Sequence, residues 1–262
     1  RMIMQTIHLY DLLEIQKIRE PEIQIVSNLS FLPVNENNLV YKAARLLQEE
    51  FALTDGISVK LTKRIPVAAG MAGGSTDAAA MLYAMNQLYD LGLSRRELMK
   101  RGVQIGADVP YCLMRGTALA EGIGEKLTQL PPMIKCPVLI AKPSISVSTK
   151  FVYQNLKLDE QTNHPDIDAL MKDIREKDFD GVCAHMGNVL ESVTIPNYPV
   201  IAEIKQQMMR SGAKASMMSG SGPTVFGLFE DGETAKRALR EMKRSGLAKQ
   251  VYLTTIYNNR RK

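Results

Sequence analysis

The 262-residue chain contains no tryptophan, and aromatic residues make up only 6% of it. A protein that holds single-stranded nucleic acid by base stacking needs aromatic side chains among basic ones. Here the 33 Lys and Arg residues are dispersed along the chain instead. The shortage of aromatic residues therefore argues against a nucleic-acid partner. The net charge of +5 still suits an anionic small molecule.

Cysteines and long apolar runs are also scarce. The three cysteines, Cys112, Cys136 and Cys183, are far apart and odd in number, which favours free thiols in a reducing cytoplasm over disulfides. None of the three histidines has a partner at the spacing of a metal site. The sequence has no run of about 18 apolar residues, so we expect no membrane span, and nothing in it resembles a signal peptide. These absences predict a cytoplasmic globular protein.

The most informative stretch is a glycine-rich loop between a predicted strand and a predicted helix. Before the loop, Ile57, Val59 and Leu61 alternate with polar residues, which is typical of a half-buried strand. After the loop, apolar residues recur at helical spacing as far as Leu88. The loop and the start of the helix comprise Pro66, Val67, Ala68, Ala69, Gly70, Met71, Ala72, Gly73, Gly74, Ser75 and Thr76.

This arrangement predicts a nucleotide-phosphate site. We expect Gly70, Gly73 and Gly74 to adopt dihedrals that other residues avoid, and Ser75 to Asp77 to present the unpaired N–H groups of the first helical turn. Such N–H groups and the helix dipole favour a phosphate. No lysine follows the glycines, which excludes the P-loop pattern, and the Rossmann spacing is not matched either. A plain tight turn into an alanine-rich helix stays open as an alternative.

A second candidate is Asp108, in the segment Gly-Ala-Asp-Val-Pro. Proline disfavours a helical conformation in the residue before it, so we expect extended backbone at Val109 and a helix-to-strand junction at Asp108. The carboxylate could cap a turn, or it could stand at a loop tip as a base or metal ligand.

The remaining pattern predicts mixed helices and strands with a domain boundary near residue 142. In the first part we expect strands at 2–9, 12–15 and 22–26, a helix at 39–51 capped by Asn37 or Asn38, a capping box at Ser94 to Glu97, and two edge strands around a glycine turn at 116–125. In the second part we expect strands at 137–141, 215–218, 225–229 and 250–257, and helices at 166–177, 179–193, 199–210 and 234–243. A glycine-rich turn, Ser219 to Thr224, could be a hairpin loop and nothing more.

Taken in order, the Gly70 loop, the Asp108 segment and the Ser219 to Thr224 turn resemble the GHMP kinases. The Gly-Ala-Asp-Val-Pro segment and the Gly-x-Gly-Glu125 segment resemble the family member that acts on a cytidine-diphosphate-linked methylerythritol in the non-mevalonate isoprenoid route. The resemblance implies an α+β, two-domain fold with the active site between the domains. Residues 1–142 would form an ATP-binding, ribosomal-S5-like α/β domain, and residues 143–262 would form a ferredoxin-like α+β domain.

The resemblance also implies the roles of individual residues. ATP, with Mg²⁺, would bind through its phosphates to Pro66 to Thr76, and Asp108 would take the proton from the 2-hydroxyl of the substrate. It assigns four residues to the substrate: Thr149, Tyr153, Gly220 and Gly222. The implied partner is a small molecule, with no nucleic acid and no membrane. Neither the Mg²⁺ ligands nor the oligomeric state follows from it.

One family segment has no counterpart in this sequence. The GHMP member described above has an Ala-Lys-x-Asn-Leu segment whose lysine acts beside the aspartate, and this motif is absent. We expect about thirty residues, and with them the catalytic lysine, to be missing from the front of the chain, a length that ordinary strands and loops accommodate. Two alternatives stay open: a GHMP kinase for another small alcohol, and a non-catalytic nucleotide-binding relative.

Overall fold

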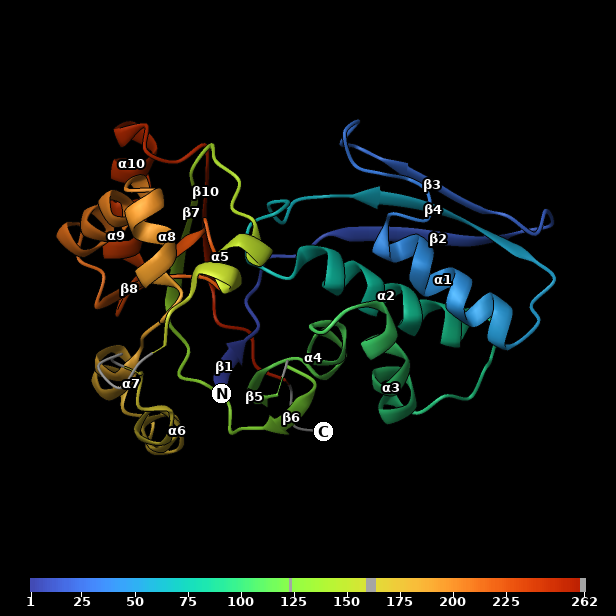
Figure 1. Ribbon diagram of the computed structural model, residues 1–262, viewed down its shortest axis with the longest axis horizontal. Coiled ribbons are helices and arrows are strands. Elements are labelled where there is room, and N and C mark those ends of the chain that lie inside the picture. The colour runs from blue at the N-terminus through green and yellow to red at the C-terminus, as the bar shows by residue number, and fades with distance from the viewer. Residues whose placement is uncertain (123, 159–163, 260–262) are drawn as a thin grey trace. The chain divides into compact units, whose positions relative to one another are not determined.

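The computed structural model describes residues 1–122, 124–158 and 164–259, which form two compact units (Figure 1). The first unit comprises Arg1–Met4, Leu9–Val67 and Ala72–Gln129. The second comprises Gln5–His8, Ala68–Met71 and Leu130–Lys262. Residue 123, in the predicted glycine turn, lies outside the described residues.

The main sheet of the first unit has three strands, in the order β2 (Leu12–Ile18), β4 (Gly56–Thr62) and β3 (Ile23–Ser27). β4 is antiparallel to β2 and parallel to β3. The alternation in β4 is confirmed, because Ile57, Val59 and Leu61 are all buried. The inward face of β4 therefore forms part of the core.

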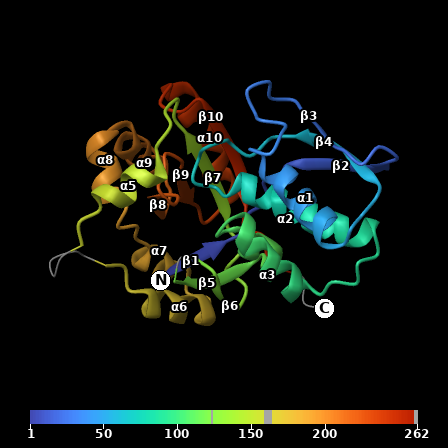
Figure 2. The same ribbon diagram turned by 45° about the vertical axis from the view of Figure 1, so that its right-hand side comes forward.

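Four helices belong to the first unit: α1 (Leu39–Glu50), α2 (Gly73–Leu88), α3 (Arg95–Ile105) and α4 (Val109–Met114). α1 and α2 lie along the same side of the sheet in both views (Figures 1 and 2), and their buried residues share one core with the strands. The Asn38 side chain accepts a hydrogen bond from the Val40 N–H at 2.9 Å, so Asn38 is the cap of α1. The capping box of Ser94 and Glu97 is also confirmed.

Two predictions about residues 108–121 are wrong. The first concerns β5 (Thr117–Glu121), which we expected at an edge. It is the central strand of a three-stranded sheet, between β1 (Met2–Gln5) and β6 (Lys126–Gln129). Only a pairing between distant segments, invisible to local pattern, makes β5 a central strand.

The second wrong prediction concerns the residues after Asp108. Val109 begins helix α4, with Pro110 in its first turn, so Asp108 joins two helices and not a helix to a strand. The first turn of a helix tolerates proline, since the N–H that proline lacks has no intrahelical acceptor there. Val109, the residue before Pro110, is therefore helical despite the usual preference of such residues for extended backbone.

The second unit contains a four-stranded antiparallel sheet in the order β10 (Gln250–Thr255), β7 (Pro137–Lys142), β9 (Val225–Leu228) and β8 (Ala215–Met218). The sheet shares a core with α9 (Val200–Arg210) and α10 (Gly232–Ser245). Three short helices, α5 (Thr149–Asn155), α6 (Ile167–Glu176) and α7 (Phe179–His185), lie in the same unit. The strand and helix pattern of the second half is thus largely confirmed.

The single helix expected at 179–193 is wrong. The segment divides into α7 and α8 (Glu191–Asn197), with Met186 in an extended conformation after α7. Between them, the Asn188 side chain donates to the backbone oxygens of Met218 and Gly220 at 2.9 and 2.8 Å. Asn188 therefore leaves the helical path to support the glycine-rich turn that follows β8.

Candidate functional site

The glycine-rich loop gains its shape partly from alanines. Positive φ angles occur at Ala68, Gly70 and Ala72, whereas Gly73 and Gly74 are helical, so our expectation about the dihedrals holds for Gly70 alone. At Gly73 the constraint is space. A Cβ added there would lie 3.0 Å from Ile65 Cγ2, so a side chain would press into the structure beneath the loop.

Helix α2 begins two residues earlier than we expected. Ala72 is its cap, in the left-handed region, and makes no side-chain cap bond. The first intrahelical bond runs from the Thr76 N–H to the Ala72 oxygen at 2.8 Å. The N–H groups without an intrahelical acceptor therefore belong to Gly73, Gly74 and Ser75. These donors, with the positive end of the helix dipole, form an anion-binding arrangement.

The tip of the loop packs against the turn between β8 and β9, within the second unit. Ser219 Oγ donates to the backbone oxygen of Gly70 at 2.7 Å. A Cβ added to Gly70 would lie 2.3 Å from the backbone oxygen of Ser219. One added to Gly220 would lie 3.4 Å from the backbone oxygen of Gly70. The loop tip thus lies too close to the turn for a side chain at position 70, whereas the distance at Gly220 is an ordinary van der Waals contact.

Asp108 lies at the start of α4 and is half buried. Its side chain makes no cap bond, so the simple capping interpretation is not supported. Burial raises the pKa of the Asp108 carboxyl above its ordinary value. A half-buried carboxylate without a cap bond is available for proton transfer.

Helix α4 places Asp108 near the first turn of α2. The Thr76 hydroxyl and the Cys112 sulfur are 3.4 Å apart, and a Cβ added to Gly106 would lie 3.8 Å from Ser75 Oγ. Burial raises the pKa of the Cys112 thiol to about 12, so Cys112 is a neutral packing residue here. Within the first unit, the start of α4 therefore lies near the first turn of α2, where the glycine-rich loop ends.

The four residues assigned to the substrate lie in the second unit. Thr149 Oγ1 is 2.8 Å from Ser221 Oγ, which joins the start of α5 to the glycine-rich turn. Gly220 and Gly222 have φ angles of +55° and +85° within that turn. Tyr153 is on the next turn of α5 and its side chain is exposed. An exposed aromatic ring is free to meet a ligand.

A buried cluster of three charged residues was not singled out from the sequence. Lys63 Nζ binds the carboxylates of both Asp11 and Asp77, with 2.7 Å to Asp77 Oδ2. A sign of it was present in the sequence: Lys63 continues the inward-facing register of Ile57, Val59 and Leu61. A lysine at a core-facing position needs a buried partner.

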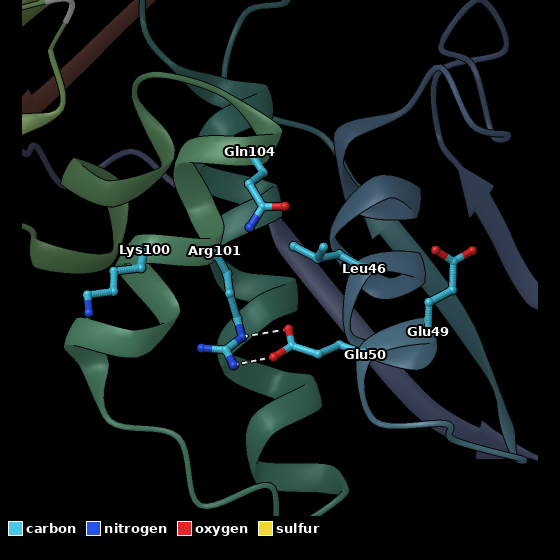
Figure 3. Close-up of a pocket in the computed structure, with 6 residues that line it drawn as sticks. All are labelled: Leu46, Glu49, Glu50, Lys100, Arg101 and Gln104. Carbon is cyan, nitrogen blue, oxygen red and sulfur yellow. Dashed lines mark hydrogen bonds and ion pairs between the residues drawn. The ribbon is translucent and has the colours of Figure 1, made fainter.

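A separate pocket of about 600 Å³ lies between α1 and α3 (Figure 3). Its lining residues are Leu46, Glu49, Glu50, Lys100, Arg101 and Gln104. Arg101 binds Glu50 through two hydrogen bonds across the pocket. None of the candidate residues lines it, and its central charges satisfy each other, so we assign it no ligand.

Among residues 1–122, 124–158 and 164–259, no group of three or more His, Cys, Asp or Glu side chains is arranged to hold a metal ion. Over the same described ranges, no helix is long and apolar enough to cross a membrane.

Two family models match the chain. The one described as GHMP kinases N terminal domain matches residues 38–116, and the one described as GHMP kinases C terminal matches residues 170–248. The first match contains both the glycine-rich loop and Asp108, and the second contains the turn after β8.

Curated relatives and solved structures agree with these matches. A 4-diphosphocytidyl-2-C-methyl-D-erythritol kinase from Lachnospira eligens is 58% identical, over 98% of this chain and 89% of the relative. An enzyme of the same name from Geobacillus sp. is 47% identical, over 99% of this chain and 89% of the relative. The crystal structure of a 4-(cytidine 5'-diphospho)-2C-methyl-D-erythritol kinase, 28% identical, superposes with a TM-score of 0.83 over 98% of this chain and 90% of that one. A homoserine kinase structure from Cytophaga hutchinsonii, 22% identical, shares the fold with a TM-score of 0.79, over 94% of this chain and 86% of that one.

Proposed function

The chain belongs to the GHMP kinase family, and we propose from that premise that it transfers the γ-phosphate of ATP to the 2-hydroxyl of 4-diphosphocytidyl-2-C-methyl-D-erythritol. It is a small-molecule kinase, and its relatives at 46–58% identity share one enzyme name. The observation that carries the mechanistic proposal is the proximity of Asp108 to the first turn of α2. That turn carries three N–H groups without intrahelical acceptors, those of Gly73, Gly74 and Ser75.

The loop would act by binding the phosphates of ATP. The N–H groups of Gly73, Gly74 and Ser75 lack intrahelical acceptors and would donate to phosphate oxygens. Phosphoryl transfer passes through a loose transition state, so positioning and stabilisation of negative charge account for most of the catalysis. We therefore assign the phosphates to Pro66 through Thr76.

Asp108 would act as the general base. Its raised pKa brings it closer to the working pH, which improves a base that must accept a proton from an alcohol. The proton would pass from the 2-hydroxyl of the substrate to the Asp108 carboxylate as the new P–O bond forms.

Mg²⁺ would accompany the nucleotide. This ion binds few protein groups and takes its remaining ligands from water and substrate phosphates, so a dedicated carboxylate cluster is not needed. The Ser75 hydroxyl would fit such a donor set, because it lies on the first turn of α2, beside the N–H groups that would bind the phosphates. When bound, the ion neutralises charge on the phosphates.

Recognition of the cytidine half would fall to the second unit. Thr149 supports the glycine-rich turn containing Gly220 and Gly222, and the exposed Tyr153 ring offers a surface on which a base can stack. We further propose that 1–142 is the ATP-binding domain and 143–262 the C-terminal kinase domain. The enzyme would work in the cytoplasm, without a nucleic-acid partner.

A substrate panel tests this function. Full-length protein would be assayed for ADP release with 4-diphosphocytidyl-2-C-methyl-D-erythritol, with 2-C-methyl-D-erythritol 4-phosphate, and with homoserine and mevalonate. We expect turnover with the first compound alone. Turnover with homoserine or mevalonate would assign another substrate, and ATP binding without any turnover would identify a non-catalytic relative.

The base is tested by Asp108→Asn in the same protein. We expect the rate to fall by roughly 10²–10⁴, the usual contribution of a general base. The affinity for ATP should survive, because the amide keeps the shape of the carboxylate. Near-full activity of the Asn variant would show that another group accepts the proton.

A further inference from the structure

Three charged residues that the proposed mechanism does not use lie buried beneath the glycine-rich loop. The side chains of Lys63, Asp11 and Asp77 are only 3%, 1% and 4% exposed. Lys63 Nζ lies 2.7 Å from Asp77 Oδ2 and also binds Asp11 Oδ2. Removing charges from water is costly unless they are paired and hydrogen-bonded, so the three side chains depend on one another.

The cluster holds the chain on both sides of the loop. Before the loop, Asp11 Oδ1 accepts hydrogen bonds from the N–H groups of Arg64 and Ile65 at 2.5 and 2.8 Å. After the loop, Asp77 lies near the start of α2. Lys63 joins the two carboxylates, so one ammonium group connects both ends of a loop of about ten residues.

Lys63 is itself held in place. The Asn28 side chain accepts from the Lys63 N–H at 2.8 Å and donates to the Lys63 oxygen at 3.2 Å. A Cβ added to Gly73 would lie 3.4 Å from Lys63 Nζ, so the ammonium is directly beneath the first residue of α2. The first turn of α2, which carries the N–H donors, therefore lies next to a buried ammonium group whose position is fixed.

We propose that Lys63 is a positioning residue of the glycine-rich loop, which holds the chain after β4, at Ile65, and the start of α2, at Gly73, at the separation that ATP requires. This inference rests on the proposed function, because it takes the loop to be the phosphate site. Lys63 acts through Asp11 and Asp77 and does not itself touch the nucleotide.

The composition of the cluster favours a geometric role over simple stabilisation. Among the described residues, Asp77 Oδ1 is buried without a hydrogen-bond partner, whereas Asp77 Oδ2 is held by Lys63 Nζ at 2.7 Å. Apolar side chains of similar volume often stabilise a fold as well as a buried ion pair does. What they do not supply is a directional link between two backbone segments.

The test compares Lys63→Met with Lys63→Arg in full-length protein. We expect Lys63→Met to raise the Kd for a non-hydrolysable ATP analogue, and the KM for ATP, by roughly 10-fold to 100-fold, the loss expected when an N–H donor no longer reaches a charged phosphate. The KM for the alcohol substrate should stay unchanged. Lys63→Arg keeps the charge and two donors for the carboxylates, so it should restore much of the affinity.

Two more variants cover the case in which Lys63→Met does not fold. Asp77→Leu breaks the link at the helix start, whereas Asp77→Asn keeps an oxygen that can accept from Lys63. We expect Asp77→Leu to weaken ATP binding far more than Asp77→Asn does. Lys60→Met is the matched control, since Lys60 lies on β4, which ends just before Lys63, but is exposed and pairs with Glu14. It should leave the KM for ATP unchanged.

A purely structural cluster would give a different result. In that case the variants would lower Tm, while the folded fraction kept the wild-type Kd for the ATP analogue, and the inference would be overturned although the proposed function stood. If the wild-type protein itself did not bind the ATP analogue, that result would contradict the proposed function, and the inference that rests on it would fall with it. A selective rise in the ATP constants, reversed by Lys63→Arg, is the result that supports the inference.

Discussion

Ser219 Oγ donates a hydrogen bond to the backbone oxygen of Gly70 at 2.7 Å, although 149 residues separate them in the sequence. Gly70 and Ser219 belong to two glycine-rich segments that the sequence suggested separately. The contact makes the tip of the glycine-rich loop and the turn after β8 a single local structure of the second unit. This contact leaves no space for a side chain at position 70.

Gly70→Ala should destabilise the protein more than Gly92→Ala does. Both glycines have φ of +68°, so either alanine incurs the left-handed penalty of about 1–2 kcal/mol. A Cβ at Gly92 meets nothing within 4 Å, whereas one at Gly70 would lie 2.3 Å from the Ser219 oxygen. Thermal unfolding of both variants measures the difference. Equal Tm values would mean that the loop tip moves away from the turn at little cost.

Gly73→Val should weaken ATP binding while the fold persists. The Cβ and the methyl groups would press on Ile65 and Lys63 beneath the loop and so displace the N–H groups of the α2 first turn, which we propose as phosphate donors. Calorimetric titration with an ATP analogue gives the affinity, and circular dichroism checks the fold. Wild-type affinity in a folded variant would remove the loop from the phosphate site.

Tyr153→Ala should raise the KM for the cytidine-containing substrate more than the KM for ATP. A lost base–aromatic stack costs about 1–3 kcal/mol, which sets the expected size of the change. Tyr83→Ala is a matched control, because Tyr83 and Tyr153 are both 55% exposed and Tyr83 is on α2. Equal changes in the two KM values would place base recognition elsewhere.

Asp108→Asn should raise the stability of the 262-residue protein at neutral pH. Burial raises the Asp108 pKa above its unfolded value, so ionisation opposes folding: stability is fully present below the unfolded pKa and is lost as pH rises through the folded pKa. Unfolding measured from pH 3 to pH 8 should show the variant gaining most at the upper end. A constant difference across that range would contradict the assignment of a raised pKa.

The His185–Asp173 pair gives a pH dependence in the second unit. His185 Nδ1 lies 2.6 Å from Asp173 Oδ2, and the hydrogen bond to this carboxylate raises the pKa of His185. The contribution is therefore complete below the unfolded histidine pKa and is lost as pH rises through the higher folded value. The His185 side chain is 42% exposed, so the effect on the free energy of unfolding should be small. His185→Gln should remove it, and the exposed His164→Gln should not.

The sequence by itself determined the family and most of the helices and strands. The GHMP assignment from three motifs is confirmed by the two family matches and by relatives as similar as 58% identity. Motifs succeed here because the loop, Asp108 and the turn after β8 each need particular residue types close together in the chain. The individual roles of these residues stay predictions, as does the division into 1–142 and 143–262.

Only the tertiary structure decided which distant residues meet. Local pattern could not place β1 beside β5, bring Asn188 to the turn after β8, or give positive φ to Ala68 and Ala72 where we expected glycines. Nor could it pair Lys63 with Asp11, 52 residues away, and with Asp77. The physical reason is the same in each case. Backbone preference and hydrophobic period are set by neighbours in sequence, whereas the partner of a buried polar group is set by how the chain packs.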